Sequence, residues 1–341
     1  MDITGRNRQL IWEQLQPHTP PPVILGLLEQ RDRRHQSRQY GIVDARGEAV
    51  TFSGSENGPY AGGLTGQLGT LVYSIQGNVL TGHPVLVEAE LAVLSTPGGI
   101  PEKLMAAMEA ARELGGDGRC SCSPQDPTGC GSPPPEFEKS AHVGFMIVTR
   151  RGGVDGECTQ TRGCANGTYY MSFNVRNQDA NDPDPVFQLR ERFDEWRAGL
   201  IGVHDAAESR ITITPDRLLS DGTSTATTRI EVRDWQGAPA VDILAVDVLH
   251  DPAGSAGSST IGPLHELGDG VYELELTAGT TPGRDVIAVR VSDPIGQRYL
   301  VPSGRLIIQD RRADLNGDGV VDLADLAILL QRLRRLGRRR R

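Results

Sequence analysis

The sequence lacks any run of about 18 apolar residues, so no segment is expected to span a membrane. Its first ten residues, MDITGRNRQL, have no apolar stretch of the kind that forms the centre of a signal peptide. The seven histidines form neither an HExxH nor a His-x-His pattern, and no serine lies in a G-x-S-x-G motif. A zinc-protease or serine-hydrolase site of the usual kind is therefore not expected.

Charge is distributed unevenly along the chain. The net charge of −9 includes seven arginines between positions 332 and 341, so residues 1–331 alone carry about −16. An acidic body disfavours nucleic acid as the main partner, because binding to phosphates depends on lysine and arginine. The basic end, residues 337–341, is expected to be a solvated, disordered tail, with contacts to anionic lipid, cell-wall polymer or nucleic acid as the alternative.

All five cysteines lie in two loop-like stretches rich in glycine and proline. This placement favours disulfides formed in an oxidising compartment, with Cys158 and Cys164 closing a short loop and Cys120 and Cys130 as further candidates. One cysteine must stay unpaired. A zinc site is the alternative, because these stretches offer several thiolates, but their spacing matches no standard zinc pattern.

Residues 1–200 mix helix and strand signals without regular alternation, which predicts a layered α+β domain of αββα type. The strand-like segments are 39–44, 47–54, 71–78, 142–150 and 168–175. The first two are expected to form a hairpin around a short turn. The helix-like segments are 84–94, 101–116 and 184–200.

Residues 208–309 contain strand signals alone, separated by turn clusters such as SDGTS and DPAGSAGSS. Apolar residues alternate along this region, for example at Tyr272, Leu274 and Leu276. Six or more short strands at this spacing predict an immunoglobulin-like β-sandwich.

The segment DLNGDGVVDLAD, in a C-terminal region of residues 312–336, predicts a calcium-binding loop followed by a helix. Its oxygen ligands occupy alternating positions, and Gly319 stands where such a loop turns sharply. The candidate ligands are Asp314, Asn316, Asp318, the backbone carbonyl of Val320, Asp322 and Asp325. Calcium is therefore the expected cofactor.

An aspartate at the twelfth loop position and the strand-like GRLIIQ before the loop resemble the dockerin type I calcium repeat of bacterial extracellular proteins. The resemblance covers residues 313–336. Complete dockerins carry two repeats and this chain shows one, so a dockerin-type protein partner is not expected. A loop of this kind fills at extracellular calcium concentrations, which places the protein outside the cell.

Two further resemblances cover the larger regions. The runs PDRLLSDGTSTATTRIEVRDWQGAPA and GDGVYELELTAGTTPGRDVIAVRV resemble the bacterial immunoglobulin-like modules of the invasin and intimin class, which implies a spacer or adhesion stalk at 208–309. The segments QYGIVDARGEAVTFSG, YSIQGNVLTG, ARELGGDGR, HVGFMIVTR and DPDPVFQLRERFDEW resemble the family known as domain of unknown function 1028. That resemblance implies a fold of the N-terminal-nucleophile hydrolases, in which a first-residue threonine, serine or cysteine attacks an amide.

The chain departs from that pattern at its start. Met1 is followed by Asp2, and the family's opening strands have no counterpart before GRNRQLIW. We therefore expect a truncated N-terminus that lacks the nucleophile and the signal peptide.

Four polar residues are the candidates for a pocket. Gln76 and Asn78 end a predicted strand, while Asp117 and Arg119 follow two glycines at the end of a predicted helix. Turn capping is the alternative role for such side chains.

The sequence thus favours a secreted or surface-attached bacterial multidomain protein. One hypothesis is an amide hydrolase acting on extracellular peptides or cell-wall fragments. The other is a non-catalytic binding or adhesion protein whose N-terminal domain holds a ligand or a protein partner.

Overall fold

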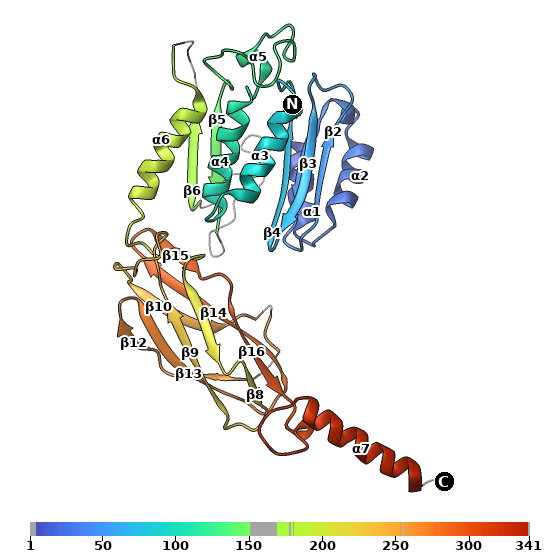
Figure 1. The fold of residues 1–341 in the computed structure, drawn as a ribbon, viewed down its shortest axis with the longest axis vertical. Coiled ribbons are helices and arrows are strands. Elements are labelled where there is room, and N and C mark those ends of the chain that lie inside the picture. Colours follow the sequence, from blue (N-terminus) through green and yellow to red (C-terminus); the bar gives the residue numbers. More distant parts are fainter. Residues whose placement is uncertain are drawn as a thin grey trace. The chain divides into compact units, whose positions relative to one another are not determined.

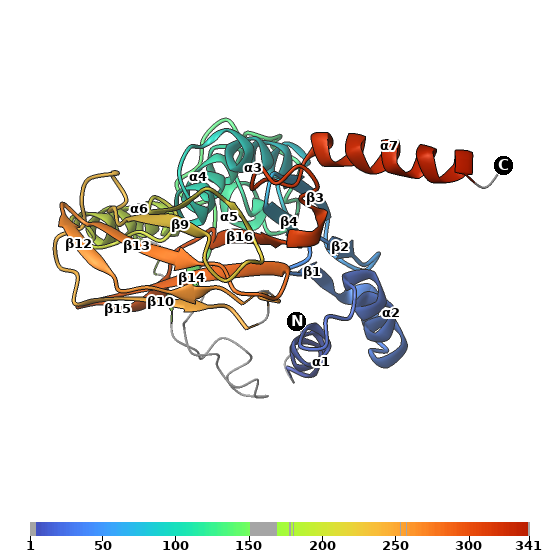
Figure 2. The same ribbon diagram turned by 90° about the horizontal axis from the view of Figure 1, so that it is seen from below.

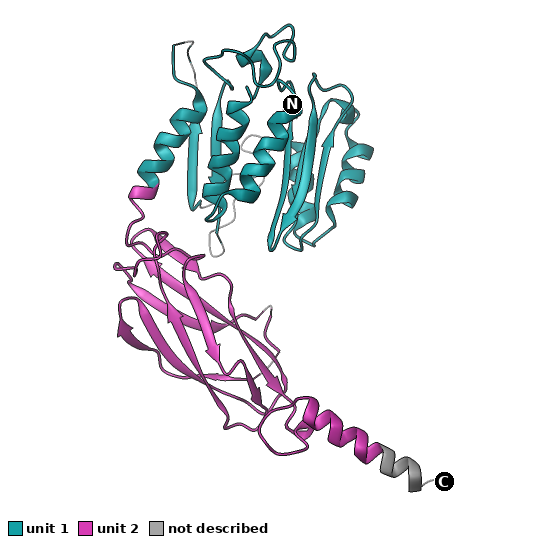
Figure 3. Cartoon of the chain, in the orientation of Figure 1, with its two compact units in different colours: residues 1–196 teal, residues 197–341 magenta. Residues whose placement is uncertain are grey.

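The computed structural model describes residues 5–150, 169–176, 179, 181–252, 254–256 and 258–339, without the side chains of 334–339. Contacts divide the chain into two compact units, Met1–Trp196 and Arg197–Arg341 (Figure 3). None of the described helices is both long and apolar enough to cross a membrane.

The N-terminal unit is mixed α/β, as the sequence predicts (Figure 1). Its strands are β1 (Gln39–Val43), β2 (Ala49–Ser53), β3 (Gly62–Leu68), β4 (Leu71–Gly77), β5 (Gly144–Val148) and β6 (Met171–Val175). Its helices are α1 (Arg6–Leu15), α2 (Pro21–Arg31), α3 (Pro84–Ser95), α4 (Ile100–Glu113), α5 (Gly118–Ser121) and α6 (Pro185–Ala198), with a 3-10 turn at His35–Ser37. The strands form three antiparallel pairs, β1–β2, β3–β4 and β5–β6.

The first two strand pairs pack against each other, and helices cover their outer sides. Gln39 of β1 donates from Nε2 to the carbonyl oxygen of Gly77 at 2.6 Å, which joins the pairs. The two strand pairs approach each other so closely that a Cβ added to Gly63 of β3 would lie 2.1 Å from Thr51 Oγ1 of β2. Helices α1 and α2 share an apolar core with β1–β2, and α3 and α4 share one with β3–β4. The resulting order of layers is helix, strand pair, strand pair, helix.

The third pair, β5–β6, has its own core with α4 and α6. Met105 of α4 and Leu189 of α6 are fully buried there, together with Met146 and Met171 from the strands. Arg190 of α6 forms a two-pronged ion pair with Glu109 of α4 at 2.6 and 2.7 Å. The two helices are therefore fixed to the same face of this hairpin.

The second unit contains a β-sandwich, as predicted. One sheet has the order β10-β14-β16-β8 with β15 on β14, and the other has the order β11-β13-β9-β7 with β12 on β13. Its strands are β7 (Arg210–Thr214), β8 (Arg217–Leu219), β9 (Thr225–Glu231), β10 (Ala245–His250), β11 (Thr260–Ile261), β12 (His265–Gly268), β13 (Val271–Thr277), β14 (Gly283–Asp293), β15 (Gly296–Tyr299) and β16 (Gly304–Gln309). The alternating residues Tyr272, Leu274 and Leu276 are buried in its core.

The sandwich is followed by a 3-10 turn at Arg311–Ala313, the aspartate-rich loop and α7 (Leu323–Arg339). Figure 2 shows α7 as one continuous helix. A disordered tail was expected from residue 337, but the helix continues to Arg339. Arginine is a good helix former, and Arg338 and Arg339 continue the helix despite the low helix propensity of Gly337.

Candidate functional site

The predicted pocket residues Asn78 and Asp117 lie close together because the end of β4 pairs with the turn after α4. Leu80 forms an isolated β-bridge with Asp117, and the backbone N–H of Gly118 donates to the Val79 carbonyl at 2.8 Å. After α4 and Leu114 come two glycines with positive φ, Gly115 at 95° and Gly116 at 54°. These left-handed conformations favour glycine and bring the chain back toward β4.

Asp117 and Arg119 pair with each other at this turn. Asp117 caps α5 by accepting the Arg119 backbone N–H at 2.9 Å. Its Oδ1 also accepts Arg119 Nε at 2.9 Å, and its Oδ2 accepts Arg119 Nη2 at 2.5 Å. The two residues therefore form one charged, partly exposed feature, and the capping role considered from the sequence applies to Asp117.

Of the two amide candidates, Asn78 comes just before the residues that pair with this turn, whereas Gln76 lies against Gly41 of β1. Asn78 donates from Nδ2 to Asn57 Oδ1 at 3.1 Å. Gln76 is exposed on β4 and accepts from Ser74 Oγ at 3.1 Å. Both side chains keep further donors or acceptors for a ligand.

Cys120 and His142 approach Asp117, and no sequence pattern had indicated this histidine. One ligand atom from each of the three lies within 4.8 Å of the others, a separation that a zinc ion could bridge. Arg119, however, occupies both carboxylate oxygens of Asp117, and its guanidinium would repel a metal cation. The donor set therefore does not fit zinc in this arrangement.

Cys120 is the free cysteine among the described residues. Burial, followed by the negative charge of Asp117, raises the pKa of its thiol to about 11. The thiolate is the reactive form, so this cysteine is a poor nucleophile at neutral pH.

This state of Cys120 predicts slow alkylation. With iodoacetamide at pH 7, Cys120 is expected to react about 100-fold more slowly than an unhindered cysteine, and its rate should rise tenfold per pH unit up to pH 10. Peptide mapping by mass spectrometry measures this rate, with Cys120→Ser to identify the peptide. Rapid labelling at pH 7 would contradict the assignment.

The structure pairs the cysteines of this region differently from the candidate set. Cys130 forms a disulfide with Cys122, and Cys120 stays free. The turn at the end of α5 explains the choice, since the Cys130 backbone N–H approaches Cys122 Sγ at 3.1 Å while Cys120 faces Asp117. Cys158 and Cys164 lie outside the described residues.

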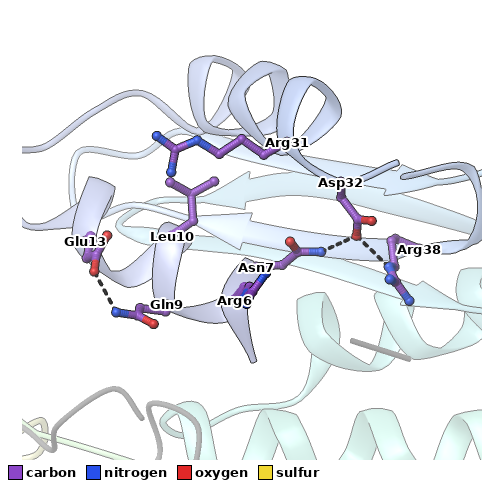
Figure 4. Close-up of a pocket in the computed structure, with 8 residues that line it drawn as sticks. All are labelled: Arg6, Asn7, Gln9, Leu10, Glu13, Arg31, Asp32 and Arg38. Carbon is purple, nitrogen blue, oxygen red and sulfur yellow. Dashed lines mark hydrogen bonds and ion pairs between the residues drawn. The ribbon is translucent and has the colours of Figure 1, made fainter. Parts of the chain in front are cut away.

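A separate open cavity of about 650 Å³ lies between α1 and the segment after α2 (Figure 4). Its polar centre is Asp32, whose Oδ2 accepts from Asn7 Nδ2 at 2.6 Å and from Arg38 Nε at 2.7 Å. The bond from Arg38 holds the pKa of Asp32 well below its usual range. Arg6 and Arg31 add positive charge to the lining. Sequence reasoning missed this cavity, because its residues belong to α1, the end of α2 and the segment after it, and they form no recognisable motif.

The aspartate-rich loop is wound by hydrogen bonds from its own backbone. Asp314 accepts from the N–H groups of Gly317 at 2.7 Å and Gly319 at 3.0 Å, and both glycines have positive φ. The predicted ligands Asn316 and Asp318 are exposed and bond to each other at 2.7 Å. The carbonyl of Val320 and the carboxylate of Asp322 belong to the same turn, and Asp322 accepts the N–H of Ala324 where α7 begins.

Asp325 is the one buried carboxylate of the loop, 3% exposed. It accepts backbone N–H groups from Leu315, Asn316 and Asp322 at 2.6 to 3.2 Å. These bonds, led by that from Asp322, lower its pKa. The donor set is all oxygen and fits calcium in kind, although in the described residues no three of these carboxylates converge within 4.8 Å.

Comparison with known proteins assigns each unit a relative. Residues 6–124 match a family of unknown function (DUF1028), and residues 205–297 match invasin, domain 3. No curated protein matches the chain.

Among solved structures, the chain is similar to adhesins and to invasin. The Yersinia pseudotuberculosis adhesin InvE matches with 22% identity over 32% of this chain and 28% of that chain, at a TM-score of 0.27. Invasin, described as a bacterial integrin-binding protein, matches with 19% identity over 42% and 23%, at 0.27. The Escherichia coli adhesin FdeC matches with 20% identity over 32% of each chain, at 0.26.

The chain thus spans less than a third of the length of each of these structures. The TM-scores are too low to establish a shared overall structure. The two family matches do not cover the end of the N-terminal unit or the C-terminal loop and helix. The chain therefore combines a DUF1028-like region with an invasin-like β-sandwich.

Proposed function

We propose that this protein is a surface-exposed bacterial binding protein, in which the invasin-like sandwich carries an N-terminal ligand-binding domain. The observation that carries the proposal is the match of residues 205–297 to invasin, domain 3, over a region that folds as a β-sandwich. The ligand class that fits is an extracellular protein, peptide or cell-wall fragment.

The chemistry of the turn at Asp117 supports binding over catalysis. Cys120 carries a proton at neutral pH, and Asp117 is held by Arg119 rather than free to act as a base. The same pair can bind a polar ligand, because the partly exposed guanidinium of Arg119 has a second edge that Asp117 does not occupy.

The proposal predicts binding without turnover. The purified full chain is tested by biolayer interferometry against extracellular-matrix proteins, integrin ectodomains and peptidoglycan fragments. Arg119→Gln and Asp117→Asn are expected to weaken the strongest interaction at least tenfold. Asn can keep the helix cap, so the second variant should remain folded.

The control is Asp126→Asn, which changes charge equally in the neighbouring exposed loop and should alter affinity less than twofold. Absence of binding to every member of the panel would contradict the proposal. Equal losses of affinity for Asp126→Asn and Asp117→Asn would show that the ligand does not bind specifically at the turn of Asp117.

An amide hydrolase of the N-terminal-nucleophile type is the second candidate. The helix, strand pair, strand pair, helix order of the N-terminal unit and its DUF1028 match favour it. Incubation of the same panel with catalytic amounts of protein, followed by mass spectrometry, separates the two. If each protein molecule cleaves an amide bond in many substrate molecules, the protein is a hydrolase and the binding proposal is wrong.

We also propose that the loop from Asp314 to Asp325 binds calcium. The support is its set of oxygen ligands at alternating positions and its winding around two glycines of positive φ. Calcium would stiffen the junction between the sandwich and α7.

A further inference from the structure

Helix α7 exposes a continuous row of leucines, here called the leucine stripe. Its members are Leu323 (79% exposed), Leu326 (47%), Leu329 (43%), Leu330 (47%) and Leu333 (54%). Spacings of three and four residues place them on one side of the helix. Five leucines exposed side by side form an apolar surface that soluble proteins usually cover.

The other sides of α7 have different roles. Asp325 and Ile328 fall about a quarter turn or more away from the centre of the stripe, and Asp325 fixes the helix to the loop through its three backbone bonds. Gln331 and Arg332 are exposed away from the stripe. Seven of the ten residues from 332 to 341 are arginine, so the chain is strongly basic where the stripe ends. The helix is therefore apolar along one side and leads into a strongly basic end.

We propose that α7 binds the surface of an anionic lipid bilayer, lying in the plane of the membrane with the leucine stripe among the acyl chains. A helix of 17 residues is about 25 Å long, and its arginines exclude a transmembrane position. An exposed leucine stripe on a helix with an arginine-rich end fits an interfacial helix on an anionic membrane. This inference is independent of the proposed binding function.

Charge favours lipid over a second copy of the chain as the partner of the stripe. Residues 323–341 contain seven arginines and one acidic residue, Asp325. Two copies joined through their stripes would double this positive charge along a short bundle, and each helix would repel the other. Anionic headgroups neutralise the arginines instead.

The test is flotation of the full chain with vesicles of 30% phosphatidylglycerol and 70% phosphatidylcholine. Wild type is expected to float with these vesicles, and at least tenfold less with pure phosphatidylcholine or in 0.5 M NaCl. Leu330→Asp should reduce the floating fraction at least tenfold. Gln331→Asp is the matched control, because it introduces the same charge one residue away on the other side of the helix, and it should change flotation less than threefold.

Three results would overturn the inference. One is wild type that stays unbound at 30% phosphatidylglycerol. Another is an equal loss for Leu330→Asp and Gln331→Asp, since charge alone would then govern binding. The third is a stripe that pairs two chains, seen as a dimer by light scattering that Leu330→Asp converts to monomer while flotation is unchanged. Circular dichroism of both variants checks that α7 stays helical.

Discussion

Replacing Asp293 by asparagine is expected to lower the free energy of unfolding of the sandwich by about 3 kcal/mol. Asp293 lies 2.6 Å from both His204 Nδ1 and Arg298 Nη2, and all three residues are buried. Removal of the carboxylate leaves a buried guanidinium without this partner, which is the most destabilising way to alter a buried ion pair. Urea denaturation measures the change.

The pH dependence of stability tests the same cluster. Arg298 Nε donates to His204 Nε2 at 3.3 Å, so the imidazole accepts at Nε2 and is neutral, with its proton on Nδ1 toward Asp293. Burial lowers the pKa of His204. Burial alone would raise the pKa of Asp293, but the hydrogen bond from His204 and the charge of Arg298 hold it below its usual value.

The lowered pKa values of His204 and Asp293 both make the folded sandwich less stable as the pH falls. The unfolded chain takes up protons at His204 near pH 6.5 and at Asp293 near pH 3.8, before the folded chain does. The sandwich should therefore lose stability as the pH falls from 7 to 5, and lose more below pH 4. The control for Asp293→Asn is Asp247→Asn, which breaks the exposed ion pair with Arg290 and should lower the free energy of unfolding by less than about 1 kcal/mol. A rise in stability on acidification would refute the neutral assignment of His204.

Periodic apolar patterns predicted the sandwich and most of the N-terminal elements. The hairpin at 39–54 and the helix starting near Pro101 form as expected, because alternation and a first-turn proline are local signals. Strand β3 gave no such signal, since GGLTGQL has the composition of a turn. It is a strand because it pairs along its full length with β4, and its glycines allow close contact with Thr51.

The candidate site was also predictable only in part, because local signals indicate its turns but tertiary packing decides its contacts. Glycines at the end of a helix indicated that Asp117 sits in a sharp turn, and the structure pairs this turn with Val79 and Leu80, the residues that follow Asn78. The approach of His142 depends on tertiary packing after a long cysteine-bearing loop. Whether Cys120 or Cys122 pairs with Cys130 depends on which side of a single helical turn each faces, and spacing does not encode that choice.

Calcium binding should be abolished when either Asp314 or Asp325 is replaced by alanine. Asp314 is the first loop position and holds both glycine N–H groups, while Asp325 closes the loop from the helix side. In each variant a ligand is lost together with the bonds that wind the backbone. Isothermal titration calorimetry on the full chain should give a Kd of about 10⁻⁴ M for wild type and no measurable heat for either variant.

The matched control for this loop is Asp310→Asn, just before it. Asp310 pairs with Arg312 and carries no predicted ligand role, so its variant should bind calcium as wild type does. The lowered pKa of Asp325 adds a pH criterion, because this carboxylate stays ionised to a pH below its usual value of 3.8. Its contribution to calcium binding should therefore persist when the pH falls from 7 to 5. Equal heats from wild type and Asp325→Ala would show that the winding of this loop serves the fold of the junction alone, without an ion.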